Sequence, residues 1–239
     1  MMAPFSLWRS YPISLSSRDP WNMAEPAARL YLITPVVDDP AVFAPRLAEA
    51  CATGHVAALL LRLPKAEERT LVNHIKVLAS SVQDHGTALI IASAGEADLA
   101  IVAGRAGADG VHVTSGQFDL KDLRQQLKSE RALGIGGLRT KDEAMAAGEA
   151  GADYLLFGEP RADGSIPALD SVIERAAWWA EIFETPCVAY AADLNAIPTL
   201  VATHAEFIAF GDAVWSHPEG PAKAVAAAVA LIGEREAQD

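Results

Sequence analysis

One segment constrains the fold of this chain more than any other. It runs from Ala106 to Gly116 and reads Ala-Gly-Ala-Asp-Gly-Val-His-Val-Thr-Ser-Gly. This order is typical of a helix end, a tight turn, a buried strand and a loop bounded by glycine. The same plan recurs from Ala150 to Gly158, starting 44 residues after Ala106, and more weakly from His204 to Gly211. A repeated helix–turn–strand–glycine unit predicts a series of βα modules, which close readily into a barrel.

The rest of the chain alternates in the same way. Short apolar runs predict strands that are covered on both faces, and each is followed by helical spacing. The predicted strands are 30–33, 56–61, 87–92, 111–113, 132–136, 154–157, 187–191 and 207–210. The predicted helices are 38–53, 66–84, 96–105, 120–127, 140–148, 169–184, 194–203 and 220–233. A chain of 239 residues suits a (β/α)8 TIM barrel of one domain. An open doubly wound α/β sheet of eight strands is the alternative.

The first residues differ from the repeating part. Residues 1–25 contain scattered prolines and serines without any sustained period, and they lack the apolar core of a secretory signal. We expect a flexible N-terminal extension over residues 1–25, with Met23 as an alternative start. The barrel is then expected to occupy residues 26–239.

Charge and cysteine usage restrict the function classes. The net charge is −12, from 31 acidic and 19 basic residues, which argues against binding to nucleic acid or to an anionic membrane surface. No apolar run approaches the ~18 residues of a membrane span. Cys51 and Cys187 lack the spacing of a disulfide framework or a zinc site, so we expect buried thiols and a cytoplasmic protein. A phosphorylated small metabolite remains a suitable ligand, and a homo-oligomer is left open.

A barrel places its site at the carboxyl ends of the strands, and two side chains stand out there. Arg62 closes an apolar strand, where its guanidinium could bind phosphate or pair with a neighbouring acid. His112 lies between two valines, and strand alternation turns it into the barrel if the valines face the helices. It is then either a core histidine or an acid–base group.

The remaining candidates have equally plain alternatives. Gly136, Gly137 and Gly211 stand at strand ends, where backbone amides could approach a phosphate, or where a turn needs glycine. Asp119 is a candidate magnesium ligand, but it also stands where a helix N-cap is expected.

Several motifs together resemble one known family. They are Leu-Tyr-Leu-Ile-Thr at 30–34, Ala-Asp-Gly-Val-His ending at His112, Ala-Gly-Ala-Asp-Tyr with Phe157-Gly158, and the strand after Pro186 followed by Asn195. From residue 30 to about 215 the chain is similar to thiamine phosphate synthase and its thiazole tautomerase relative. The resemblance implies a (β/α)8 barrel. It also implies a transferase of thiamine biosynthesis that joins hydroxymethylpyrimidine diphosphate to thiazole phosphate with magnesium and releases pyrophosphate.

The resemblance carries over to the site only in part. The family pattern Gln-x-Arg-x-Lys keeps Arg62, while Lys65 stands one position late. One expected magnesium carboxylate is Ser93, which leaves Asp119 as the acidic ligand. Arg139 adds a cation after the fifth strand. The predicted catalytic residue is His112, the predicted metal ligand is Asp119, and the predicted substrate-binding residues are Arg62, Gly136, Gly137, Arg139, Gly158 and Gly211.

These departures keep three functions open. Loss of a lysine and a magnesium carboxylate removes charge that would offset a leaving pyrophosphate, and Asp212 adds negative charge near Gly211. The first function is a thiamine phosphate synthase with an eroded pyrophosphate and magnesium site. The second is a tautomerase-like isomerase with His112 as proton shuttle. The third is a non-catalytic binder of a phosphorylated thiamine-related metabolite.

Overall fold

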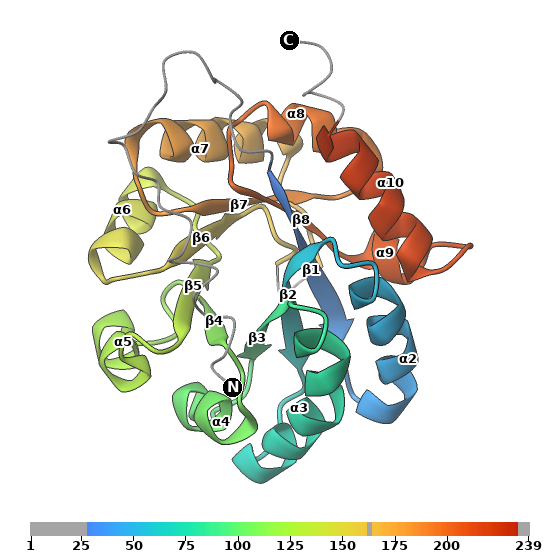
Figure 1. The fold of residues 1–239 in the computed structure, drawn as a ribbon. Coiled ribbons are helices and arrows are strands. Elements are labelled where there is room, and N and C mark those ends of the chain that lie inside the picture. The colour runs from blue at the N-terminus through green and yellow to red at the C-terminus, as the bar shows by residue number, and fades with distance from the viewer. Residues whose placement is uncertain (1–27, 162–163, 234–239) are drawn as a thin grey trace, which may run out of the picture.

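The computed structural model describes residues 28–161 and 164–233, so the extension predicted over residues 1–25 lies outside the described residues. The strands form a closed parallel barrel in chain order, with helices around it (Figure 1). The predicted (β/α)8 fold is therefore confirmed. The strands are β1 (Arg29–Val36), β2 (Val56–Leu63), β3 (Ala88–Ser93), β4 (Gly110–Thr114), β5 (Ala132–Gly136), β6 (Tyr154–Phe157), β7 (Cys187–Ala191) and β8 (Phe207–Phe210).

The helices follow the predicted pattern with two differences. The predicted helix over 194–203 is a 3-10 turn, η1 (Leu194–Ala196), followed by α8 (Ile197–Val201), and a four-residue helix, α9 (Asp212–Trp215), follows β8. Asp193 caps η1 through the N–H groups of Asn195 and Ala196. The other helices are α2 (Pro40–Cys51), α3 (Glu68–Gln83), α4 (Leu99–Ala106), α5 (Leu120–Leu127), α6 (Lys141–Glu149), α7 (Leu169–Ile182) and α10 (Pro221–Gly233).

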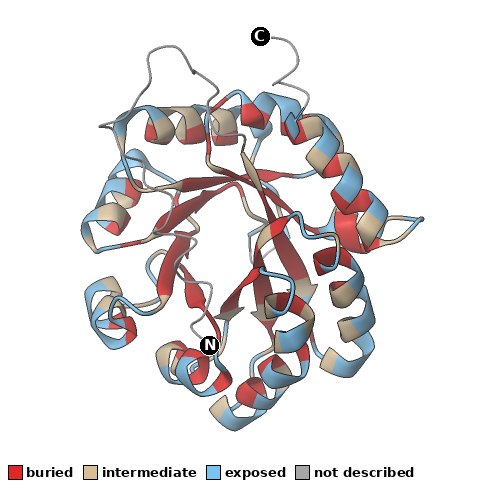
Figure 2. Ribbon diagram, viewed as in Figure 1, coloured by how far each residue is buried: buried red, intermediate tan, exposed pale blue. Residues whose placement is uncertain are grey.

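Alternation along the strands sorts apolar side chains into two groups. One group fills the barrel and includes Tyr31, Tyr154 and Tyr190, while the larger group packs between the strands and the helices. Figure 2 shows nearly continuous burial along the strands and buried residues on the inward faces of the helices. This explains why the strands are apolar on both faces.

Acidic residues of the repeated motif tie strands together at the amino ends of the barrel. The carboxylate of Asp109, just before β4, accepts the N–H of Leu89 in β3 at 2.7 Å. Asp153 makes the same contact with Leu133 in β5 at 2.8 Å. Glu206, before β8, accepts the N–H of Cys187 in β7 at 2.8 Å. The repeat therefore has a structural purpose: each acid accepts a backbone N–H at the start of the strand preceding its own.

The predicted burial of both thiols is confirmed, and an aromatic pair packs in the same layer between strands and helices. Both Cys51 and Cys187 are free and buried. Trp179 is buried and stacks on Phe183 with 4.0 Å between ring centroids. Among the described residues, no helix combines the length and the apolar character needed to cross a membrane.

Candidate active site at the mouth of the barrel

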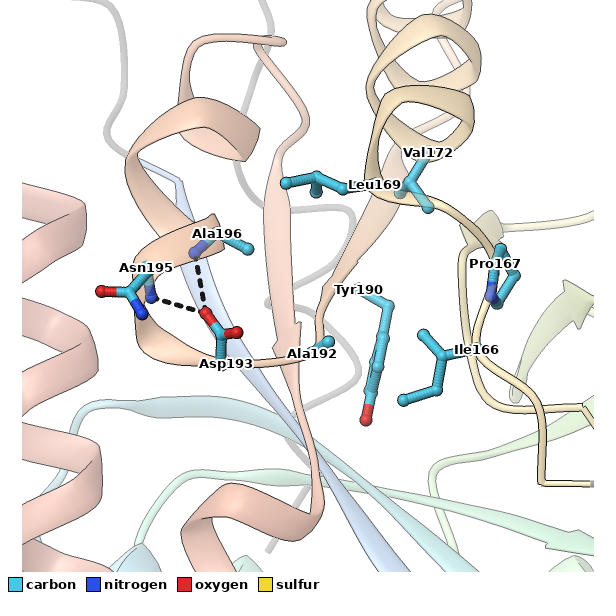
Figure 3. Close-up of a pocket in the computed structure, with 9 residues that line it drawn as sticks. All are labelled: Ile166, Pro167, Leu169, Val172, Tyr190, Ala192, Asp193, Asn195 and Ala196. Carbon is cyan, nitrogen blue, oxygen red and sulfur yellow. Dashed lines mark hydrogen bonds between the residues drawn. The ribbon is translucent and has the colours of Figure 1, made fainter.

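Two pockets open among the loops at the carboxyl ends of the strands. One, of about 230 Å³, lies between the loop before α7 and the segment after β7. In Figure 3 the Tyr190 side chain stands beside Ile166, with Asp193 on the other side of the pocket. The second, of about 280 Å³, lies between residues 93–96 after β3 and residues 117–118 after β4. Both lie at the end of the barrel where βα loops build active sites.

His112 projects into the barrel, as strand alternation predicted. Its neighbours Val111 and Val113 pack toward the helices, whereas His112 Nδ1 lies 3.0 Å from the hydroxyl of Tyr154. That hydroxyl lies 2.8 Å from the hydroxyl of Tyr31 on the far side of the barrel. Burial lowers the pKa of His112 to about 4, so its imidazole is uncharged near neutral pH. His112 is therefore buried and hydrogen-bonded, at one end of a line of polar groups formed with Tyr154 and Tyr31, and its acid–base role stays a prediction.

The line fits because β5 carries glycine where its side chains would enter the barrel. A Cβ on Gly134 would lie 2.0 Å from Cζ of Tyr154, so the phenol ring occupies the space of the missing side chain. Above it, a Cβ on Gly136 would lie 2.1 Å from Oε1 of Glu159 and 2.7 Å from Nε2 of His112. Glu159 and His112 thus converge on one point beside the backbone of Gly136.

Glu159 follows β6 directly and binds the turn after β5. The N–H of Gly137 donates to Oε1 of Glu159 in a short hydrogen bond. Gly137 has a φ of +69°, a left-handed conformation that glycine adopts at little cost. Burial raises the pKa of Glu159 to about 7, although the Gly137 amide, Arg175 and Arg62 act to lower it. This carboxyl group therefore changes charge near neutral pH.

Neighbouring residues hold the same turn from its other sides. The carbonyl of Gly136 accepts the N–H of Ser115 at 2.8 Å. The carbonyl of Leu138 accepts a hydrogen bond from the guanidinium of Arg175 at 2.5 Å. The Gly136–Gly137 turn is therefore fixed in place, so the Gly137 amide is preorganised for a hydrogen-bond acceptor.

Arg62 lies on the inward-facing register of β2, near the mouth. The charge of Arg62 acts to lower the pKa of Glu159 and that of Tyr190. Burial and the charge of Asp212 nevertheless raise the pKa of Tyr190 to about 12. Among the described residues Arg62 forms no ion pair. The guanidinium thus lies near acidic groups without forming an ion pair with any described one, which leaves it available to an anionic ligand.

Three other predicted substrate residues have mainly structural contacts in the described part of the chain. A Cβ on Gly158 would lie 2.6 Å from Val172 of α7, and one on Gly211 would lie 3.0 Å from the hydroxyl of Tyr190. Arg139 is exposed, and its N–H donates to Glu143 at 2.6 Å in the cap of α6. Their binding roles remain predictions.

The predicted magnesium ligand, Asp119, already has partners within the protein, and so does Ser93, which stands in place of the other expected carboxylate. Asp119 caps α5, where Oδ1 accepts the N–H groups of Lys121 and Asp122 at 3.0 and 3.1 Å. The hydroxyl of Ser93 donates to the carbonyl of Pro64 at 3.0 Å. The described residues contain no group of three or more His, Cys, Asp or Glu side chains placed to hold a metal. This donor set does not fit a magnesium site formed by the protein alone, and we derive no step through a metal.

Sequence reasoning missed Glu159 and the two tyrosines of the polar line. Glu159 lies in the loop expected at the mouth, directly after Gly158, and a carboxylate at the end of a barrel strand was the available signal. Tyr154 ends the repeated motif, and its inward register faces Gly134 on the neighbouring strand. Its hydroxyl would have predicted a polar partner inside the barrel.

Comparison with known proteins gives a consistent result. The chain matches the family model described as thiamine monophosphate synthase over residues 30–214. Thiamine-phosphate synthase of Rhodospirillum centenum is 38% identical over 200 residues, which cover 83% of this chain and 94% of that protein. The enzyme of the same name from Hyphomonas neptunium is 35% identical over 218 residues, covering 87% and 95%.

Solved structures support the fold. Thiamine phosphate pyrophosphorylase from Pyrococcus furiosus superposes with a TM-score of 0.69 at 21% identity, covering 86% of this chain and 96% of that one. A 3-hexulose-6-phosphate synthase gives a TM-score of 0.62 at 15% identity, covering 84% and 99%. At such identities the likeness concerns the barrel, while the sequence relatives carry the family.

Proposed function

The chain belongs to the thiamine monophosphate synthase family, and on that premise we propose that it is a thiamine-phosphate synthase. The observation that carries the proposal is the length of the match. It includes the loops after every strand up to residue 214 as well as the scaffold, and the Rhodospirillum centenum relative is covered over 94% of its length. The reaction would join hydroxymethylpyrimidine diphosphate to thiazole phosphate and release pyrophosphate. No observation favours the isomerase or the non-catalytic binder.

We assign roles to the residues at the mouth on chemical grounds. Arg62 would bind the diphosphate, since a guanidinium offers two donors in one plane and is not held in an ion pair. The amides of Gly136 and Gly137 would add backbone donors from a turn that is already fixed. His112 would hold or move a proton at Nε2, because its imidazole is uncharged at neutral pH and lies beside Gly136.

Magnesium enters the proposal only as a requirement to be tested. Mg²⁺ commonly takes one or two carboxylates together with substrate phosphates, so Asp119 is the ligand that the family pattern suggests. A cytoplasmic location, a phosphorylated metabolite as ligand and a homo-oligomer belong to the same proposal.

The test is release of pyrophosphate by the purified protein with both substrates and magnesium. We expect release by the wild type and a loss of about a hundredfold or more in Arg62→Gln, since one charged contact to the transition state is removed. Arg105→Gln is the matched control, because Arg105 pairs with Glu68 on the outer helices. No release under any magnesium concentration would overturn the proposal. Turnover of a thiazole tautomer instead, lost in His112→Ala, would favour the isomerase.

A further inference from the structure

We propose that Glu159 makes the Gly136–Gly137 corner a proton-linked anion site, in which a phosphate or diphosphate group binds together with one proton. Glu159 is then a specificity-determining residue, because it sets the charge that the corner presents to a ligand. The inference rests on the proposed function for the identity of the anion alone. The linkage itself can be measured without turnover.

The geometry shows that a carboxyl group already occupies the corner. The Gly137 N–H, the donor that would bind a phosphate oxygen, donates to Oε1 of Glu159. The same oxygen lies 2.1 Å from where a Cβ of Gly136 would stand, so it sits directly against the turn. A ligand oxygen cannot use this amide while the carboxylate oxygen is there. Glu159 must therefore give up the hydrogen bond when an anion enters.

Replacement of the Glu159 oxygen by a ligand oxygen depends on whether the Glu159 carboxyl group is protonated. An ionised Glu159 beside a bound dianion would add repulsion in a partly buried place, whereas a protonated Glu159 could donate to a ligand oxygen. The charged or titratable groups facing Glu159 are Arg62 on β2, Arg175 on α7, His112 on β4, Tyr154 on β6 and Tyr31 on β1. Binding would thus favour the protonated form.

The titratable side chains around Glu159 do not change charge near neutral pH. His112 is uncharged across the neutral range, because burial lowers its pKa to about 4. Burial raises the pKas of Tyr31 and Tyr154, so both phenols stay protonated. Burial raises the pKa of Glu159 to about 7, so it is the group in this cluster whose charge changes near neutral pH.

Sulfate is the probe, because its charge is constant across this range and it takes up no proton itself. Titration calorimetry at constant ionic strength would follow its affinity for the full chain. We expect wild-type affinity to fall about tenfold between about pH 6 and about pH 8, following the protonated fraction of Glu159. Near pH 7, buffers of different ionisation enthalpy should reveal uptake of about half a proton per sulfate bound.

Two variants isolate the carboxylate. Glu159→Gln removes the charge and keeps the shape, and Glu159→Ala also frees the Gly137 amide. Both should bind sulfate with little dependence on pH and with no proton uptake. At about pH 8 both should bind about tenfold more tightly than the wild type.

Two control variants guard against other sources of the effect. Glu206→Gln removes another carboxyl group with a raised pKa, at the amino ends of the strands, and should keep the wild-type dependence. His217→Gln removes an imidazole in the loop after α9 and should also keep the wild-type dependence. If the pH dependence survives in Glu159→Gln, or vanishes in His217→Gln, the inference is overturned. Equal wild-type affinity at both pH values would overturn it too. A failed synthase assay would not.

Discussion

Acidic side chains bind backbone amides at both ends of this barrel, but they do so in different settings. At the amino ends, Asp109, Asp153 and Glu206 repeat one contact, each with the N–H of a neighbouring strand. At the carboxyl ends, Glu159 binds the amide of Gly137, in a turn that borders the ligand space. The first three contacts hold strands in register, whereas the fourth occupies a donor that a ligand would use. The comparison suggests a rule: a hydrogen bond from a backbone amide to a carboxylate is structural where no ligand can reach the amide, and it bears on function where a ligand can displace the carboxylate.

The largest loss of stability should come from breaking a contact at the amino ends. Asp109→Ala leaves the buried N–H of Leu89 without its acceptor and removes one of the two acceptors of the Gln83 side-chain amide. We expect this to lower the free energy of unfolding by about 2–3 kcal/mol. Urea unfolding measures this. Asp109→Asn keeps an acceptor oxygen and should cost much less. Equal losses in the two variants would contradict the contact as described.

At the mouth, the corresponding change should stabilise the protein at high pH. The folded-state pKa of Glu159 is raised from 4.5 to about 7, so the folded state binds its proton more tightly than the unfolded state. Stability is therefore lost as pH rises through this window, and Glu159→Gln avoids that loss. We expect the free energy of unfolding of the variant to exceed that of the wild type by about 3 kcal/mol near pH 8 and to match it near pH 4.

Thermal unfolding of both proteins across this range checks the prediction. If Glu159→Gln is less stable than the wild type at every pH, Glu159 has a structural role like that of Asp109, Asp153 and Glu206 at the amino ends.

Between the two ends lie the hydrogen-bonded side chains of Tyr31, Tyr154 and His112, and a substitution there should lower the free energy of unfolding by less. Tyr154→Phe removes the hydroxyl that contacts both Tyr31 and His112, and we expect a loss of about 1–2 kcal/mol in unfolding free energy. Tyr190→Phe, on the next strand and also facing inward, is the matched control. A similar loss in both would show that the hydroxyl contacts of Tyr154 contribute nothing particular.

The smallest effect concerns Asp119, which can separate a helix cap from a metal ligand. Asp119→Ala should destabilise the protein by about 1 kcal/mol through loss of the α5 cap, and Asp119→Asn should restore the stability. If Asp119 also binds magnesium with the substrate, the asparagine variant should be stable but should need more magnesium for turnover. Unchanged magnesium dependence would leave capping as its whole role.

The fold was predictable because its signal is local and repeated. Each strand is a short apolar run after a turn, so β5, β6, β7 and β8 have the predicted bounds. The direction of His112 followed from simple alternation, since Val111 and Val113 pack toward the helices. A one-turn helix such as α9 has too few residues to show a period, and it was missed.

The site was predictable only where chemistry and position coincide in one residue. Arg62 is a cation at a strand end, so the sequence predicts it as a binding residue, and that role stays a prediction. Glu159 matters because it meets Gly137, 22 residues away in the chain, and because burial changes the affinity of its carboxyl group for a proton. Neither property can be read from a single sequence. Asp119 shows the reverse case, since both its capping and its ligand reading fit the same local pattern.

The placement of the strand-binding acids also bears on how such chains change over generations. Each of these acids lies in the turn leading into β4, β6 or β8, so a unit of two strands carries its own anchor within its own segment of gene. Substitutions in the loops at the opposite end leave those anchors intact. A lineage can therefore exchange one loop residue for another, an acid included, without first having to acquire a new way of holding its barrel together.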